Sequence, residues 1–296
     1  MSDQATINNA LAFYNTNITS TFSAVIDFST QTAGGASSIK GVYNNLSYLN
    51  YYTALAANSG ATGDASQVSA VASLPNTTNN PVTGTSGVQM VTTLASLYEG
   101  FTQDTTSNFS ACGALLGTAC ITIGLGELGQ AALFGVVQHE VNEVLGTSSA
   151  LRASGAPVNP SVGDLFRYGG IGVRSYAVNA DTSYPCSGAT AYFSIDGGTT
   201  NLNNYNNCNN GGDYGDWGNG RGAAVQVQDA FGSPGDVSAL TLSSSEVTLL
   251  KAIGYNFVSN SNSIAVPEPA SMSILLVSLI GLGRARRRQR RPTPAQ

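Results

Sequence analysis

The sequence predicts an α+β fold in a single domain over residues 1–257. Apolar residues over 127–146 recur near the 3.6-residue period of an α-helix, on nearly all sides, which indicates a buried central helix. Several short segments have the apolar alternation of β-strands. The stretch 147–236 is rich in Gly, Asn and Ser. This composition predicts a loop-rich C-terminal half beside a small mixed sheet.

The elements expected before the central helix are mostly helical. Residues 1–21 predict an N-terminal helix, and the alternating segment FSAVIDF at 22–28 predicts a strand. Three further helices are expected, over 42–57, around 65–73 within a loop segment, and over 88–100. The segment ACITIG at 119–124 is expected to form a strand directly ahead of the central helix.

Gly146 is expected to end the central helix, because glycine adopts the left-handed conformation that often follows a helix. In the loop-rich half, AYFSI at 191–195 is the clearest strand. Ser244 and Ser245 precede a final helix that should end near Gly254. Residues 258–265 are polar and predict a linker.

Charge is distributed unevenly along the chain. Residues 1–265 hold six basic and sixteen acidic side chains, a net charge of −10, whereas six of the ten arginines fall in the last thirteen residues. An acidic body repels phosphate backbones, which argues against nucleic acid as a partner.

The four cysteines form two local pairs in the sequence, Cys112 with Cys120 and Cys186 with Cys208. Two short-loop disulfides are the natural assignment for an exported protein. The alternative, a cysteine-based zinc site, lacks the C-x-x-C spacing that such sites use.

The only histidine of the chain, His139, lies in QHEVNEVLG and is followed by Glu140 and Glu143. Positions i and i+4 share a helix face, so His139 and Glu143 can hold one cation from the same side. Glu140 is rotated by about 100° from His139 and can act as general base toward a metal-activated water. Carboxylate is an acceptable zinc ligand at the position where histidine is more usual. The alternative is an ordinary helix with two solvated glutamates.

A third metal ligand must be an acidic residue or a cysteine, since no second histidine exists. Asp164 is the first choice, because its place 21 residues after Glu143 resembles the helix–loop–carboxylate spacing of gluzincins. Ser149 occupies the position of the metzincin third ligand, so that pattern is not satisfied. Asp213 and Asp216 compete with Asp164, and their Gly- and Asn-rich surroundings could instead support Ca²⁺. Each aspartate could also serve only in a turn or a helix cap.

Several segments, taken in order, resemble the H-E-x-x-E metalloproteases found among PEP-CTERM proteins of Gram-negative bacteria. They are HEVNEVLG, DLFRYGGIGVRSY, AYFSIDGGTTNL, GGDYGDWG and VQDAFGSPG. The closing segment LTLSSSEVTLLKAIGYNF is similar to the last helix of many metzincin-like secreted proteases. The resemblance implies a zincin-like domain with a central active-site helix that acts on a protein or peptide substrate. It implies His139 and Glu143 as zinc ligands and Glu140 as general base.

The end of the chain resembles a PEP-CTERM sorting signal over 266–291. VPEPA is followed by a short apolar run and an arginine cluster. The run is shorter than the roughly 20 residues that span a bilayer, and the arginines provide a positive-inside anchor. The resemblance implies an exosortase-type partner, transient anchoring in the inner membrane, and export to the cell surface or extracellular matrix. The alternative is an ordinary single-pass tail anchor.

The start of the chain has neither the basic nor the apolar region of a signal peptide. A start codon further upstream, or a signal already removed, would reconcile this start with export.

The predicted function is hydrolysis of peptide bonds by a metal-activated water. The alternative is a non-catalytic matrix or surface protein with a structural or vestigial metal site. A Ser-His-Asp triad built on His139 would leave the spacing of Glu140 and Glu143 unexplained.

Overall fold

The computed structural model describes residues 2–32, 35–98, 119–125, 129–183, 191–218, 225–231 and 239–258. These residues form six α-helices and three small sheets, which confirms the predicted α+β class. Residues Met1–Val258 make one compact unit. The predicted sorting signal at 266–291 lies outside the described residues. Within the described residues, no helix has both the length and the apolar character needed to cross a membrane.

The first sheet has the strand order β1-β5-β2, formed by Ile26–Gln31, Ala119–Gly124 and Ala36–Lys40. β1 runs parallel to β5, and β2 runs antiparallel to it. The strand predicted at 119–124 is confirmed, whereas β1 begins four residues later than the predicted segment 22–28. β2 was not predicted, because its sequence ASSIK carries a single large apolar residue, Ile39. In β2 the side chains of even-numbered residues are half-buried and the others are exposed.

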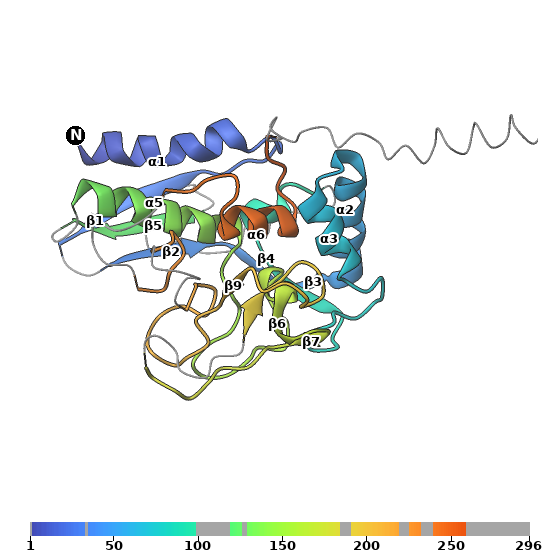
Figure 1. Cartoon of the computed structure of the whole chain (residues 1–296). Coiled ribbons are helices and arrows are strands. Elements are labelled where there is room, and N and C mark those ends of the chain that lie inside the picture. The colour runs from blue at the N-terminus through green and yellow to red at the C-terminus, as the bar shows by residue number, and fades with distance from the viewer. Residues whose placement is uncertain are drawn as a thin grey trace, which may run out of the picture. The chain divides into compact units, whose positions relative to one another are not determined.

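The long helix α5, Gln130–Leu145, packs against α1, Asp3–Asn17, and against β2 and β5 (Figure 1). Between Val137 and Gly146, His139 is the only residue that is not buried, as predicted for a central helix. Gly146 ends α5 with a φ of 117°, the left-handed region that favours glycine.

Two of the predicted helices are partly wrong. Residues Val42–Ser47 form strand β3 before helix α2, Tyr48–Thr62, begins, and Gly87–Val91 form strand β4 before the short helix α4, Thr92–Ala95. β3 and β4 pair antiparallel with each other. Each segment takes its strand conformation through a partner distant in the sequence, and such pairing overrides local helical periodicity.

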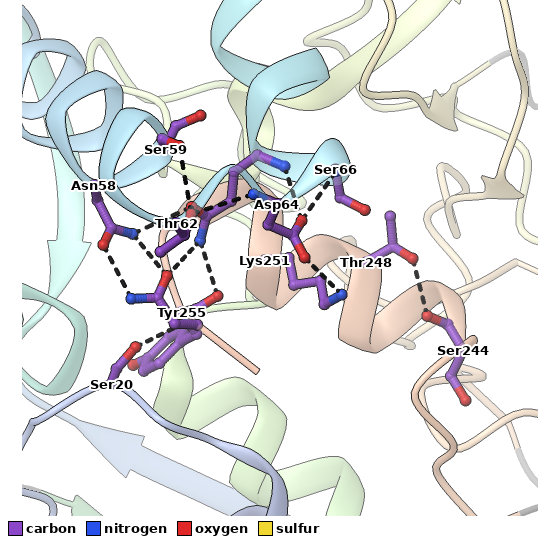
Figure 2. Close-up of polar contacts among 12 residues, drawn as sticks. Ser20, Asn58, Ser59, Thr62, Asp64, Ser66, Ser244, Thr248, Lys251 and Tyr255 are labelled. Atoms are coloured by element: carbon purple, nitrogen blue, oxygen red, sulfur yellow. Dashed lines mark hydrogen bonds and ion pairs between the residues drawn. The ribbon is translucent and has the colours of Figure 1, made fainter. Parts of the chain in front are cut away.

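The closing helix α6, Ser245–Ile253, is joined to α2 and to α3, Ala65–Ala72, by the polar contacts that Figure 2 shows. Lys251 forms an ion pair with Asp64 at 2.9 Å, and Asp64 also caps the N-terminus of α3. Asn58 of α2 donates to the carbonyl of Gly254 at 2.9 Å. These contacts fix α6 beside α5, where its Glu246 reaches the loops of the C-terminal half.

The C-terminal half is loop-rich, as predicted, and contains one sheet of very short strands in the order β7-β6-β8-β9. The strands are Val173–Arg174, Arg167–Gly170, Tyr192–Phe193 and Asn203–Asn204. The predicted strand at 191–195 is therefore only two residues long. Cys120 and Cys208 each take part in a disulfide bond, and the other two cysteines, Cys112 and Cys186, lie outside the described residues, so the two predicted pairs stay predictions.

Candidate metal centre

Helix α5 brings the residues of the predicted motif together at its C-terminal half. His139 and Glu143 lie one helical turn apart on the same face, and Glu140 follows His139. Both glutamates are buried, with 5 % and 4 % of their surface exposed, whereas the His139 side chain keeps 18 %. A buried pair of carboxylates is costly unless cations or hydrogen-bond donors compensate it, so the surrounding groups decide what this site can do.

The imidazole of His139 is oriented by a backbone carbonyl. Its Nδ1 lies 2.9 Å from the oxygen of Val227. Because a carbonyl oxygen can only accept a hydrogen bond, Nδ1 must carry the proton. Nε2 then faces Asp216, whose Oδ1 lies 3.5 Å away. When Nε2 gives up its proton, this bond leaves the tautomer that a histidine needs in order to bind a metal through Nε2.

Asp216 reaches α5 because two loop segments are joined to each other. The amide of Trp217 donates to the carbonyl of Gln228 at 2.8 Å, and the amide of Ala230 donates to the carbonyl of Trp217 at 3.0 Å. Trp217 is fully buried, and its Nε1 donates to Glu246 of α6 at 3.0 Å. The indole therefore fixes this part of the loop against the helices and holds the preceding residue, Asp216, beside His139.

A chain of buried hydrogen bonds fixes the carboxylate of Asp216. The Tyr14 hydroxyl of α1 lies 2.7 Å from Oδ1 of Asn142, and Asn142 Nδ2 donates to Gln228 Oε1 at 3.1 Å. Gln228 Nε2 then donates to Asp216 Oδ1 at 2.8 Å. The side-chain amides of Asn142 and Gln228 each accept a hydrogen bond through the oxygen and donate one through the NH₂ group. The last of these hydrogen bonds is therefore donated to Asp216, which accepts it.

Glu143 is held by two residues of strand β2. The Ser38 hydroxyl donates to Glu143 Oε2 at 2.5 Å, and the Lys40 ammonium donates to the same oxygen at 2.9 Å. Ser38 and Lys40 point to the same side of β2 because they are two residues apart. The contacts fix one oxygen of Glu143.

The ligand atoms of His139, Glu143 and Asp216 all lie within 4.8 Å of one another. The first two were predicted from the helical spacing, and Asp216 completes the group. One nitrogen and two carboxylate oxygens at these distances could hold a metal ion, and zinc is among the metals that proteins bind with such donors.

The electrostatics of the site favour positive charge. Burial alone lowers the pKa of His139, but the charges of Asp216, Glu143 and Glu140, and the bond to Val227, raise it to about 9. The same field that favours a proton on the imidazole favours a cation among these carboxylates. The pKa of Glu140 is raised to about 7, chiefly by burial and then by the charge of Glu143, while the charges of His139 and Lys40 oppose the shift.

Asp164, the first choice for the third ligand, lies outside this cluster. Its buried carboxylate accepts hydrogen bonds from the hydroxyl of Ser149, the amide of Ala150, and both the amide and the hydroxyl of Ser161. These four donors satisfy the Asp164 carboxylate, which thereby joins the loop at 149–150 to the loop at 161. Asp164 has the turn-forming role that the sequence left open as an alternative.

The Ca²⁺ prediction rested on Asp213 and Asp216. Asp216 is part of the cluster with His139, and Asp213 is not one of its three members. The pKa of Asp213 is raised, first by burial of its carboxyl and then by the charge of Glu143, so it too lies close to the cluster. Over the ranges that the structure describes, no second group of three or more such side chains is found for a separate cation.

Sequence reasoning missed the supporting residues Ser38, Lys40, Val227 and Gln228. Ser38 and Lys40 belong to no motif, and Val227 and Gln228 lie in the segment VQDAFGSPG without having been given a role. Each of the four reaches the site from a segment more than 80 residues from its partner on α5. The sequence ASSIK offered no signal for this strand, because Ile39 is its only large apolar residue and no apolar alternation is present. Comparison with known proteins adds no assignment: no family model, curated protein or solved structure matches this chain.

Proposed function

We propose that this protein is a zinc-dependent peptidase whose metal is held by His139, Glu143 and Asp216. The convergence of these three ligand atoms within 4.8 Å, from a helix and a distant loop, is the observation that carries the proposal. Each ligand also has a second partner that orients it, Val227 for His139, Ser38 for Glu143 and Gln228 for Asp216. Such partners are typical of functional metal sites.

Zinc in this site would supply Lewis acidity that activates a water and polarises a carbonyl group. Three protein ligands rather than four leave room for the reacting groups, which distinguishes catalytic from structural zinc sites. The exposed fraction of His139 puts the accessible side of the cluster at the imidazole, since both glutamates and Asp216 are buried. A substrate would therefore approach over His139.

Glu140 is the general base in this proposal. It neighbours the ligand His139 on α5 but is not in the ligand group. A carboxylate beside the ligands can accept a proton from a metal-activated water and return it to a leaving amine. Glu143, by contrast, is held by Ser38 and Lys40 and is suited to remain ionised as a ligand.

The proposed substrates are proteins or peptides, and the proposed location is outside the cytoplasm. The disulfide bonds of Cys120 and Cys208 support export, because such bonds persist in oxidising compartments. The tail over 266–291 supports recognition by an exosortase-type enzyme, on the basis of its sequence alone.

The decisive experiment combines metal analysis with a cleavage assay. We expect purified protein to contain one equivalent of zinc and to cleave casein, with activity lost on chelation and restored by zinc. Glu140→Gln should retain zinc but lose activity by at least about 100-fold, since general base catalysis contributes roughly 10²–10⁴.

Three outcomes discriminate between the alternatives. Equal cleavage by wild type and Glu140→Gln would exclude Glu140 as general base. Zinc without any cleavage, in wild type and variant alike, would identify a structural metal site in a non-catalytic protein. Absence of bound zinc under saturating conditions would reject the metal site itself.

A further inference from the structure

Lys40 lies among the carboxylates of the candidate metal centre. Its ammonium contacts Glu143 Oε2 at 2.9 Å and Ser38 Oγ at 3.0 Å, and only 14 % of its side chain is exposed. The contact joins strand β2 to helix α5, two elements that pack directly against each other. The charge of a half-buried ion pair acts more strongly on a neighbouring ligand carboxylate than the charge of a surface pair, because solvent screens it less.

The charge around Lys40 is strongly unbalanced. Glu140, Glu143 and Asp216 are buried, and Asp213 lies close to Glu143. In the part of the chain that the structure describes, Lys40 and His139 are the basic groups whose charges act on these carboxylates. A divalent cation held by the ligand group would be a second positive charge beside Glu143, the carboxylate that the Lys40 ammonium already contacts.

We propose that Lys40 is a built-in counter-cation of the metal centre, which holds Glu143 in the metal-free chain and weakens zinc binding by charge repulsion. The inference rests on the proposed metal site and adds its regulation. Lys40 is a positioning residue, since it acts through Glu143. Removing the Lys40 ammonium should raise zinc affinity in two ways. Removing the ammonium leaves Glu143 without its cation in the metal-free protein, which destabilises that state, and it removes repulsion toward zinc in the bound state.

The experiment measures zinc affinity by competition with a chromophoric chelator, together with thermal unfolding with and without zinc. Lys40→Met removes the charge, Lys40→Gln removes it but keeps a hydrogen-bond donor, and Lys40→Arg retains it. Both neutral variants should bind zinc more tightly than wild type, by on the order of tenfold or more. Lys40→Arg should stay within about threefold of wild type. Zinc should raise Tm more in the neutral variants than in wild type.

Lys251→Met is the matched control, because Lys251 is the only other lysine in the chain. Its ion pair with Asp64 has the same length of 2.9 Å, and its side chain is 17 % exposed. Neither Lys251 nor Asp64 belongs to the ligand group. The control variant should lose some thermal stability without any change in zinc affinity, which separates a local charge effect from general destabilisation.

The outcomes separate this inference from the proposed function. Zinc binding by wild type, with equal or weaker binding by both neutral variants, would overturn the role of Lys40 alone. The same holds if the neutral variants fail to fold in the presence of zinc, since zinc should replace the lost cation. Failure of wild type to bind zinc would overturn both proposals.

Discussion

Nδ1 of His139 donates a hydrogen bond to the carbonyl oxygen of Val227 at 2.9 Å, although 88 residues separate the two in the chain. This contact fixes the tautomer of the only histidine and turns Nε2 toward Asp216, 3.5 Å away. A histidine on a buried helix could otherwise face the core with either nitrogen. The backbone carbonyl therefore determines that the lone pair needed for a metal lies on the side of the carboxylates.

Asp216 and Asp164 can be told apart by the same substitution. Asp216→Asn should lower zinc affinity on the order of 100-fold or more, since it removes the charge of a proposed direct ligand. Asp164→Asn should retain one equivalent of zinc but lose about 1–3 kcal/mol of unfolding free energy, because its NH₂ group would face hydrogen-bond donors. Zinc titration and urea unfolding of both variants test this. Loss of zinc only in Asp164→Asn would restore Asp164 as the ligand.

The side-chain amide of Gln228 should contribute to stability and to zinc affinity, because it accepts a hydrogen bond from Asn142 and donates one to Asp216. Gln228→Met keeps the side-chain length but leaves Asn142 Nδ2 and Asp216 Oδ1 without this partner. We expect a loss of about 1–3 kcal/mol in urea unfolding and zinc affinity lowered by about tenfold or more.

Gln67→Met provides the matched control for Gln228→Met. Gln67 is also fully buried, and its Nε2 donates to the carbonyl of Tyr255 at 3.0 Å. The control should lose comparable stability and keep wild-type zinc affinity. If both variants bind zinc as wild type does, then Gln228 has no part in orienting Asp216.

The ion pair between Asp64 and Lys251 should give stability that depends on pH. Burial raises the pKa of Asp64, but the hydrogen bond from Lys251 and those from the amides of Gln67 and Ser66 outweigh it and lower the pKa. A carboxyl with a lowered folded-state pKa stabilises the fold above its unfolded pKa of about 3.9. The contribution is lost as the pH falls through the folded-state pKa.

Asp64→Asn tests this dependence by urea unfolding at several pH values. The variant should be less stable than wild type by about 0.5–1 kcal/mol near neutral pH, because it keeps a capping oxygen but loses the charge. The difference should disappear in strong acid. A difference that stays constant down to strong acid would show that Asp64 acts only as a cap.

Gly146 is required where α5 ends. Its φ is 117°, and a Cβ there would lie 3.2 Å from Cδ1 of Ile253 and 3.3 Å from Cγ2 of Val91. Gly146→Ala should therefore destabilise the protein by about 1–3 kcal/mol in thermal or urea unfolding. At the other end of α5, Gly129 has a φ of −66°, and a Cβ at that position would have no neighbouring atom within 4 Å. Gly129 is the N-cap of α5, so Gly129→Ala should cost no more than about 0.5–1 kcal/mol, through poorer capping alone. A loss as large as that of Gly146→Ala would contradict the steric argument.

Local pattern predicted the fold where local interactions decide it. The period of 3.6 and the terminal glycine located α5, and ACITIG located β5, because a buried helix and a buried strand each carry their signature within a few residues. The segments 42–47 and 88–91 were assigned to helices instead. Their β conformation depends on pairing with each other between residues 40 to 49 positions apart, which no local period encodes.

The sequence by itself determined the pair His139 and Glu143 and the neighbouring Glu140, because helical geometry converts a spacing of four residues into a shared face. Only the tertiary structure decided that Asp216, and not Asp164, joins them. It also decided that Lys40, Val227 and Gln228 orient the three side chains. Those contacts are made by a strand and by loops whose positions depend on packing of the whole domain, and spacing along the chain carries no information about such long-range contacts.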